Sequence, residues 1–278
     1  MTPAPASQPQ LVDRHALSAR RARRRADALF LHQMARDEAE DRLSMVNRRF
    51  TAPAVVTPFP EVWQGSLPAV LPGAKLVPDD DTLALEPGAH DVVIHTMGLH
   101  WANDPVGQLI QCRRALKEDG LLLAVMLGGG TLRELRAALA EAETLVTGGL
   151  SPRVAPMGEI RDLGGLLQRA GFALPVADAV PLTAEYRDLA HLVRDLRGMG
   201  ETNALAQRLR RTPPRALFAE AERLYRAHFA TAEGRLPATF ELVCLTGWTP
   251  SETQQKPLRP GSAQMRLADA LKVPEGKI

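Results

Sequence analysis

Hydrophobic patterning is strongest in the middle of the chain. Residues 91–97 and 121–127 are nearly continuous apolar runs, which are typical of strands covered on both faces of a sheet. Apolar residues at helical spacing over 105–116 and 159–170 predict helices, and Gly171 is a suitable end for the second one. This alternation of strands and helices predicts an α/β protein with a mostly parallel sheet.

Weaker patterns predict the remaining elements. Thr131 and Glu134 form a Thr-x-x-Glu capping box at the start of an expected helix over 131–146. Further strands are expected on both sides of the central part, at 54–56, 75–77, 172–180 and 238–248. A helical insertion over 181–236 is expected before the last strand, with helices at 187–198, 202–211 and 214–230.

The N-terminal segment has a different composition. Residues 1–10 are rich in Pro, Ala, Ser and Gln, and we expect them to be disordered. Residues 14–25 hold six arginines and no acid. The spacing of apolar residues over 16–48 predicts one or two amphipathic helices. We interpret the arginine run as a solvated helix face, with a docking surface for an acidic partner as the alternative. The run also resembles a mitochondrial transit peptide, but Asp13 precedes it and its apolar face is weak.

These patterns divide the chain into three parts. A tail and basic helical arm cover 1–50, an α/β domain that includes the helical insertion covers 51–248, and a polar tail covers 249–278.

Composition limits the classes of function. The 278 residues include 34 Lys and Arg against 32 Asp and Glu, so the formal charge of +2 gives no indication of nucleic-acid binding through bulk charge. Cys112 and Cys244 cannot make a disulfide framework, and we expect a reduced, cytoplasmic protein. The longest uncharged apolar stretch, 121–132, is too short to span a bilayer, and 1–10 lacks the apolar region of a secretory signal. No Cys/His pair has metal-ligand spacing.

Two loops are candidates for ligand contact, because ligands of open parallel sheets bind at the carboxyl ends of the strands. Residues 57–61 read TPFPE, where two prolines remove amide donors and Glu61 adds negative charge. Each lost donor reduces the binding free energy of an anion by about 0.5–1.5 kcal/mol, so this loop is poorly suited to a nucleotide. The three glycines at 128–130 follow the strand at 121–127, where their amides either face a substrate or form a tight turn.

The segment GLHWAND, from Gly98 to Asp104, resembles the Leu-His-Trp-Val-Asn-Asp segment after the fourth strand of class I S-adenosylmethionine-dependent methyltransferases. It is most similar to the branch that contains mitochondrial complex I assembly factors and their alphaproteobacterial relatives, and more distantly to the carrier-protein methyltransferase of biotin synthesis. The likeness covers about residues 85 to 265 and includes MLGGGTLRELR from Met126 and DLRGMGETN from Asp195. It implies a Rossmann-like class I methyltransferase fold, S-adenosylmethionine as the cofactor if the site is functional, and a protein partner, either a complex I subunit or an assembly intermediate.

The cofactor half departs from this family. Where the family's first strand ends in Asp-Leu-Gly-Cys-Gly or close to it, residues 55–59 read VVTPF, without the acid or either glycine. The stretch before Asp79 is too short for the family's second strand and helix, although DDDTLAL at 79–85 still resembles its adenine-side motif. We therefore expect an eroded first half with no bound cofactor. We also expect Phe59 or a neighbour to fill part of the space that a cofactor would occupy.

The resemblance implies roles for individual residues. Remnants of the cofactor site are expected at Asp80, Asp81 and His100. Substrate-side residues are expected at Trp101, Asn103, Gly129, Gly130, Glu201 and Asn203. The structural alternatives stay open: a histidine packed under a helix for His100, a core residue for Trp101, and a break between helices for 198–203.

Two functions are compatible with this sequence. The first is a methyltransferase-like pseudoenzyme with lost or altered S-adenosylmethionine binding, which acts as a binding or assembly factor. The resemblance implies respiratory complex I assembly as the process. The alternative is an active S-adenosylmethionine-dependent methyltransferase or arginine-modifying enzyme with a protein substrate. Nucleic-acid binding is the weakest hypothesis, because the arginine run has no interleaved aromatic residues.

Overall fold

A six-stranded mixed sheet forms the centre of the protein, for which the computed structural model describes residues 10–254. The strands lie in the order β2-β1-β3-β4-β6-β5. The first four are mutually parallel, whereas β6 is antiparallel to both of its neighbours. Their bounds are β1 Pro53–Val56, β2 Lys75–Val77, β3 His90–Thr96, β4 Leu116–Leu127, β5 Ala173–Tyr186 and β6 Leu236–Trp248. The expected α/β class with a mostly parallel sheet is confirmed.

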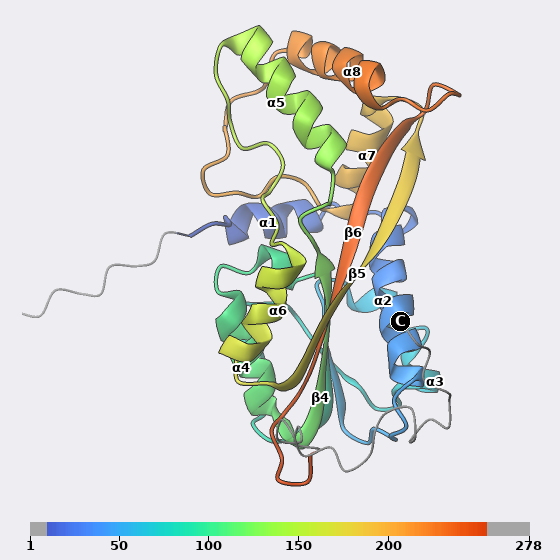
Figure 1. Ribbon diagram of the computed structural model, residues 1–278, viewed down its shortest axis with the longest axis vertical. Helices are drawn as coiled ribbons and strands as arrows, with labels where there is room; N and C mark the ends of the chain where they lie inside the picture. Colours follow the sequence, from blue (N-terminus) through green and yellow to red (C-terminus); the bar gives the residue numbers. More distant parts are fainter. Residues whose placement is uncertain (1–9, 255–278) are drawn as a thin grey trace, which may run out of the picture.

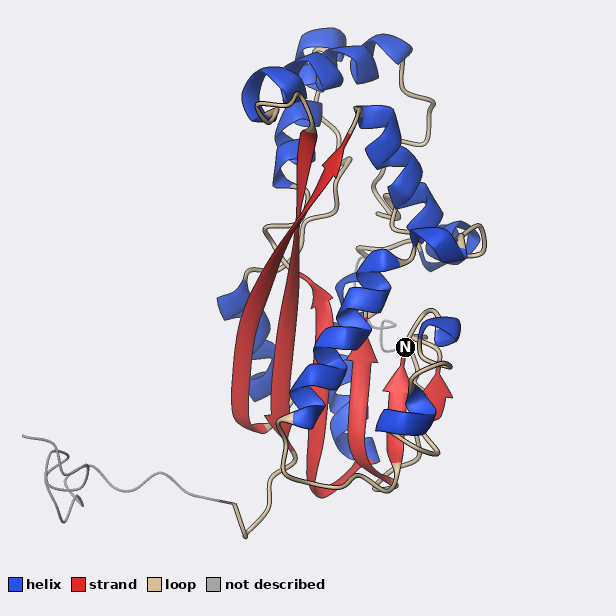
Figure 2. Cartoon of the chain, turned by 90° about the vertical axis from the view of Figure 1, so that its right-hand side faces the viewer, coloured by secondary structure: helices blue, strands red, loops and turns tan. Residues whose placement is uncertain are grey.

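Helices cover both faces of this sheet, which explains the continuous apolar runs in its strands. Val92 and Ile94 of β3 pack with α2 (Phe30–Ser44) on one face, whereas Val93 packs with α4 (Pro105–Ala115) and α6 (Ile160–Arg169) on the other. Figure 2 shows the helices on the two sides of the strands. Because successive side chains of a strand point to opposite faces, a strand buried on both sides needs apolar residues at every position.

The β5–β6 hairpin extends beyond the sheet. β4 pairs with β6 only over 242–248, whereas β5 follows β6 as far as the Tyr186–Leu236 pair. The projecting half of the hairpin lies with three helices, α5 (Arg133–Thr147), α7 (Leu189–Met199) and α8 (Arg215–Phe229), at the top of Figure 1. Tyr186, Leu192, Leu217 and Phe240 are buried there.

The N-terminal arm crosses the carboxyl edge of the parallel strands. It consists of α1 (Arg14–Arg21), the short 3₁₀ helix η1 (Ala26–Ala28) and α2. Asp13 caps α1 by accepting a hydrogen bond from Ala16 N, and Val12 forms an antiparallel bridge with Leu205. The remaining short helices are η2 (Pro60–Val62), α3 (Leu67–Val70) and η3 (Leu99–Trp101).

Three local expectations are wrong. Residues 202–211 form a loop and not a helix, and the first part of the expected helical insertion is strand, since β5 continues to Tyr186. The capping box is also wrong, because α5 starts after Leu132 and the Thr131 hydroxyl and Glu134 carboxylate bond to β6 instead. Tertiary partners on β6 therefore outcompete the local cap. The expected disorder at 1–10 falls almost entirely outside the described residues, as does most of the expected tail at 249–278.

Candidate functional site

The carboxyl ends of β1, β3 and β4 meet at one edge of the sheet, where a ligand of such a fold is expected. β1 leads into 57–61, β3 into η3, and β4 into the glycines at 128–130. The N-terminal arm also reaches this edge (Figure 1). Its side chains therefore determine how much of the edge is open.

Phe59 is completely buried in the loop after β1. Its ring makes an edge contact with the His32 ring of α2, with 4.6 Å between the centroids. The Arg24 guanidinium lies 4.9 Å from the centre of the Phe59 ring, a cation–π distance. The expected burial of Phe59 is thus observed, and its ring packs against the N-terminal arm.

Arg21 and Asp79 form a buried ion pair at the same edge. Arg21 Nη1 donates to Asp79 Oδ1 at 3.0 Å and to Oδ2 at 2.8 Å, and the two residues are only 8% and 5% exposed. Glycines allow this close approach: a Cβ at Gly98 would overlap Asp79, and one at Gly200 would lie 3.0 Å from the Arg21 backbone. The interpretation of the arginine run as a solvated face is therefore wrong at Arg21.

The two aspartates expected as cofactor remnants point outward. The side chains of Asp80 and Asp81 are 72% and 62% exposed, and each lies within 4 Å of the Arg14 guanidinium. Their backbone carbonyls accept hydrogen bonds from Gln108 and Gln111 of α4. The buried member of this acidic segment is Asp79.

Glu201 is the centre of a buried polar cluster. Its Oε2 accepts from Trp101 Nε1 at 2.5 Å and lies 3.3 Å from His100 Nε2, while its Oε1 lies 3.5 Å from His32 Nε2. Burial alone would raise the pKa of the Glu201 carboxyl, but the hydrogen bond with His100 and the nearby His32 imidazole outweigh burial and hold that pKa well below its usual range. The cluster therefore presents a carboxylate beside two imidazoles and an indole.

The helix end before Glu201 explains its position. Gly200 adopts a left-handed conformation with φ +78°, and the Glu201 amide donates back to the Leu196 carbonyl, a pattern that ends α7. The expected break between helices is thus present, and it also turns Glu201 inward. His100 and Trp101 reach the same cluster from η3.

Asn103 and Asn203 hold backbone segments in place. The Asn103 side chain accepts from Val12 N at 2.8 Å and donates to Val12 O at 3.1 Å, which fixes the start of the arm. The Asn203 amide donates to the Pro152 carbonyl at 2.6 Å, and its oxygen accepts from Leu205 N at 3.0 Å. Both amides are therefore occupied by the protein itself.

The glycines at 128–130 form a tight turn. Their amides donate to the Glu241 carbonyl, the Gly158 carbonyl and the Glu241 carboxylate. A Cβ at Gly128 would overlap Glu241, and one at Gly129 would overlap Glu159. The expectation that Gly129 and Gly130 offer free amides to a substrate is therefore wrong, because β6 and the segment before α6 already use these donors.

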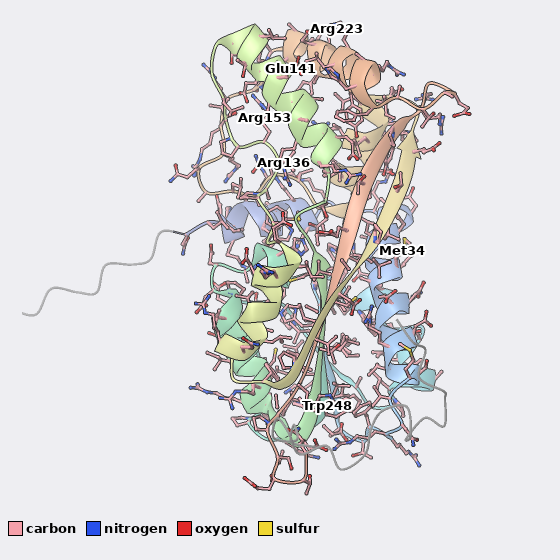
Figure 3. All side chains as sticks on the ribbon, in the orientation of Figure 1. Met34, Arg136, Glu141, Arg153, Arg223 and Trp248 are labelled. Carbon is pink, nitrogen blue, oxygen red and sulfur yellow. The ribbon has the colours of Figure 1, made fainter. Side chains whose placement is uncertain are left out.

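A cavity of about 540 Å³ lies beside this edge, under the projecting hairpin and its helices. Trp101, Glu201 and Asn203 line it, together with apolar side chains from α5, α7 and β6. Arg153, from the segment between α5 and α6, is another lining residue and is labelled in Figure 3. Three of the six expected substrate-side residues therefore share one cavity.

Sequence reasoning missed Arg21 and His32, and it chose Asp80 and Asp81 where Asp79 is the buried acid. Nothing in the sequence distinguishes Arg21 from the other arginines of its run. A signal for Asp79 existed, since it opens the segment that resembles the adenine-side motif.

Two buried histidines predict how stability depends on pH. Burial lowers the pKa of both His32 and His95. The unfolded chain thus binds more protons than the folded protein once the pH falls below about 6.5, so stability decreases with acidity. Urea unfolding at pH 7.5 and 5.5 should show a lower free energy of unfolding at pH 5.5, by up to about 1.4 kcal/mol per pH unit for each histidine. His95→Gln should reduce this slope, and equal stabilities at the two pH values would contradict the prediction.

Within residues 10–254, no helix has the length and hydropathy needed to cross a bilayer. The same part of the chain holds no group of three or more His, Cys, Asp or Glu side chains suited to a metal ion.

No family model matches the chain, but individual proteins do. It is 34% identical over 203 residues to the mitochondrial arginine-hydroxylase NDUFAF5 of Danio rerio, covering 73% of this chain and 63% of that protein. The Homo sapiens NDUFAF5 is 35% identical over 211 residues, which cover 74% of this chain and 61% of that protein. The malonyl-[acyl-carrier protein] O-methyltransferase of Laribacter hongkongensis (strain HLHK9) is 34% identical over 188 residues, which cover 68% of this chain and 61% of that protein. The solved structure of the YcgJ protein from Bacillus subtilis aligns with a TM-score of 0.49 at 11% identity and covers 79% of this chain and 100% of that one.

The fold and these relatives define the chain as a class I methyltransferase-like α/β protein. Within that class the chain is related to the proteins named NDUFAF5, which confirms the resemblance found in the sequence. The chain spans 61–63% of the length of these two NDUFAF5 proteins.

Proposed function

We propose that this chain is a binding or assembly factor that has lost the S-adenosylmethionine site of its class. The buried Arg21–Asp79 pair is the observation that carries the proposal. Asp79 opens the segment that resembles the family's adenine-side motif, yet its carboxylate is bonded to a side chain of the same protein. A nucleoside at this edge would have to displace Arg21 and leave a buried charge without its partner, which is strongly unfavourable.

The loop after β1 supports the same proposal. Phe59 is packed against His32, and the prolines at 58 and 60 have no amide donors. The Thr57 amide already donates to the Val77 carbonyl, and the Phe59 amide donates to the Thr57 hydroxyl. The residues present therefore do not fit S-adenosylmethionine, and we derive no methyl-transfer step from this edge.

A protein is the proposed partner, either a complex I subunit or an assembly intermediate. The support is the relationship to proteins named NDUFAF5, and the cytoplasmic location remains a prediction. We propose the 540 Å³ cavity as the surface that meets the partner or ligand, because Trp101, Glu201 and Asn203 line it.

An arginine-modifying activity is the second candidate, because the NDUFAF5 relatives are named arginine hydroxylases. The charge of the cavity argues against it. Its lining holds one acidic residue, Glu201, and five arginines: Arg20, Arg153, Arg197, Arg208 and Arg210. Arg153 and Arg208 are paired with Glu143 and Asp13, which leaves an excess of positive charge from Arg20 and Arg197. Like charges brought together at a binding site are costly, so this lining opposes a cationic arginine substrate.

Calorimetric titration of the full chain with S-adenosylmethionine tests the loss of the cofactor site. We expect no binding at micromolar concentrations, while a methyltransferase titrated in parallel binds. Micromolar affinity for S-adenosylmethionine would refute the proposal. Mass spectrometry of candidate partners from cells with and without the protein tests the enzymatic alternative, which would require additions of about 14 or 16 mass units that depend on the protein.

A further inference from the structure

A second cavity, of about 430 Å³, lies where α1 and η1 meet α7. Five of its seven lining residues are arginines and none is acidic: Arg20, Arg23, Arg25, Arg194 and Arg197, with Gly198 and Thr202. The contact between the two segments is fixed by the Arg25 amide, which donates to the Gly198 carbonyl at 2.8 Å. The arm and α7 thus bring together guanidinium groups that are distant in the sequence.

Most of this positive charge is not neutralised within residues 10–254. Arg25 pairs with Asp27, whereas Arg20, Arg23, Arg194 and Arg197 make no ion pair with a described residue. Arg20 Nη1 is buried and has no hydrogen-bond partner. Burial, together with the charges of Arg208 and Arg23, lowers the pKa of Arg20. Several guanidinium groups that line one cavity without a counter-charge suit an oxyanion such as phosphate, because guanidinium groups bind such anions through charge-assisted hydrogen bonds.

The arginine cavity adjoins the larger one. Arg20, Arg197 and Thr202 line both spaces, so a ligand can extend from one into the other. Away from this junction most lining residues of the larger cavity are apolar, among them Leu31, Leu135, Leu139, Val193, Phe218 and Phe240. The charged residues there are Glu201, Arg153, Arg208 and Arg210, and Arg153 and Arg208 are already paired with Glu143 and Asp13. One end of the combined site therefore favours an anion, and the other favours a hydrocarbon group.

We propose that the two cavities together bind an amphiphilic anion, namely a single alkyl or acyl chain that carries a phosphate-class head group. The head group lies among Arg20, Arg194 and Arg197, and the chain enters the 540 Å³ cavity. The inference rests on the proposed function only in taking that cavity as the ligand-facing surface, and it is independent of whether S-adenosylmethionine binds.

Calorimetry on the full chain with n-decyl phosphate, below its micelle concentration, tests this assignment. Inorganic phosphate and n-decyl glucoside serve as head-only and chain-only probes. We expect n-decyl phosphate to bind at least tenfold more tightly than either one. Affinity should also rise about fourfold for each added methylene from hexyl to decyl phosphate, because each buried methylene is transferred out of water. An affinity that does not change with chain length, or equal binding of the glucoside, would overturn the proposal.

Matched variants test the head-group end. Arg194 and Arg197 are exposed on α7, so Arg194→Gln with Arg197→Gln should leave the fold intact and weaken n-decyl phosphate binding at least tenfold. Arg169→Gln, at an exposed position on α6 away from both cavities, is the control and should bind like the parent. Unchanged affinity in the α7 double variant would overturn the assignment.

The same ligand chemistry can come from a soluble metabolite or from a membrane lipid. Co-sedimentation with phosphatidate-containing vesicles distinguishes the two sources once n-decyl phosphate has bound. If the parent chain sediments with the vesicles and the α7 double variant does not, the ligand is a membrane lipid. If the parent chain does not sediment with the vesicles, the ligand is a soluble metabolite.

Discussion

Replacing Arg21 with alanine is expected to lower the free energy of unfolding by about 3–5 kcal/mol, because it leaves the Asp79 carboxylate buried without its main partner. Arg14 lies 3.8 Å from the same carboxylate and is too distant to replace both hydrogen bonds. Urea unfolding monitored by circular dichroism measures the change. Removal of one member of a buried ion pair is among the most costly single substitutions, so the effect should exceed that of any exposed arginine.

Arg23→Ala is the matched control. Arg23 is exposed two residues further along, and its guanidinium bonds only to the Ala19 carbonyl, so its loss should change stability by less than about 0.5 kcal/mol. The double variant Arg21→Met with Asp79→Leu should recover most of the lost stability, since no charge is then left buried. An Arg21→Ala effect as small as that of Arg23→Ala would show that the pair does not hold the arm.

Replacing Phe59 with alanine should cost about 3–5 kcal/mol, the usual range for deletion of a fully buried aromatic ring. The ring contacts His32 and lies below Arg24, so its removal leaves a void between the loop and the arm. Chemical denaturation is again the measurement. The prolines at 58 and 60 restrict the loop, and this limits how far it can collapse into the space.

Phe229→Ala provides the comparison for Phe59. Phe229 is only half-buried on α8, so removal of the same ring should cost about 1–2 kcal/mol. If Phe59→Ala cost no more than Phe229→Ala, the view that Phe59 is a core residue at the strand ends would be wrong.

Local patterns in the sequence were sufficient for most elements of the sheet and its covering helices. The strand predicted at 75–77 has those bounds in the structure, and the helix predicted at 105–116 is Pro105–Ala115. Such predictions succeed because period-two and period-3.6 burial are properties of single segments. They fail at 202–211 and at the Thr131 cap, where partners from distant segments determine the local conformation.

The α/β class, the relationship to methyltransferase-like proteins and the absence of glycine from the loop after β1 follow from the amino-acid sequence alone. Three features depend on the folded chain: which of six similar arginines is buried, the pairing of that arginine with Asp79 and not with Asp80 or Asp81, and the contacts of Glu201 with Trp101, His100 and His32. The charge and size of a side chain are properties of that residue, whereas its burial depends on residues up to about a hundred positions away that folding brings to the same edge. The two cavities also depend on the folded chain, because their lining residues come from several segments, among them α1 and α7, that are distant in the sequence.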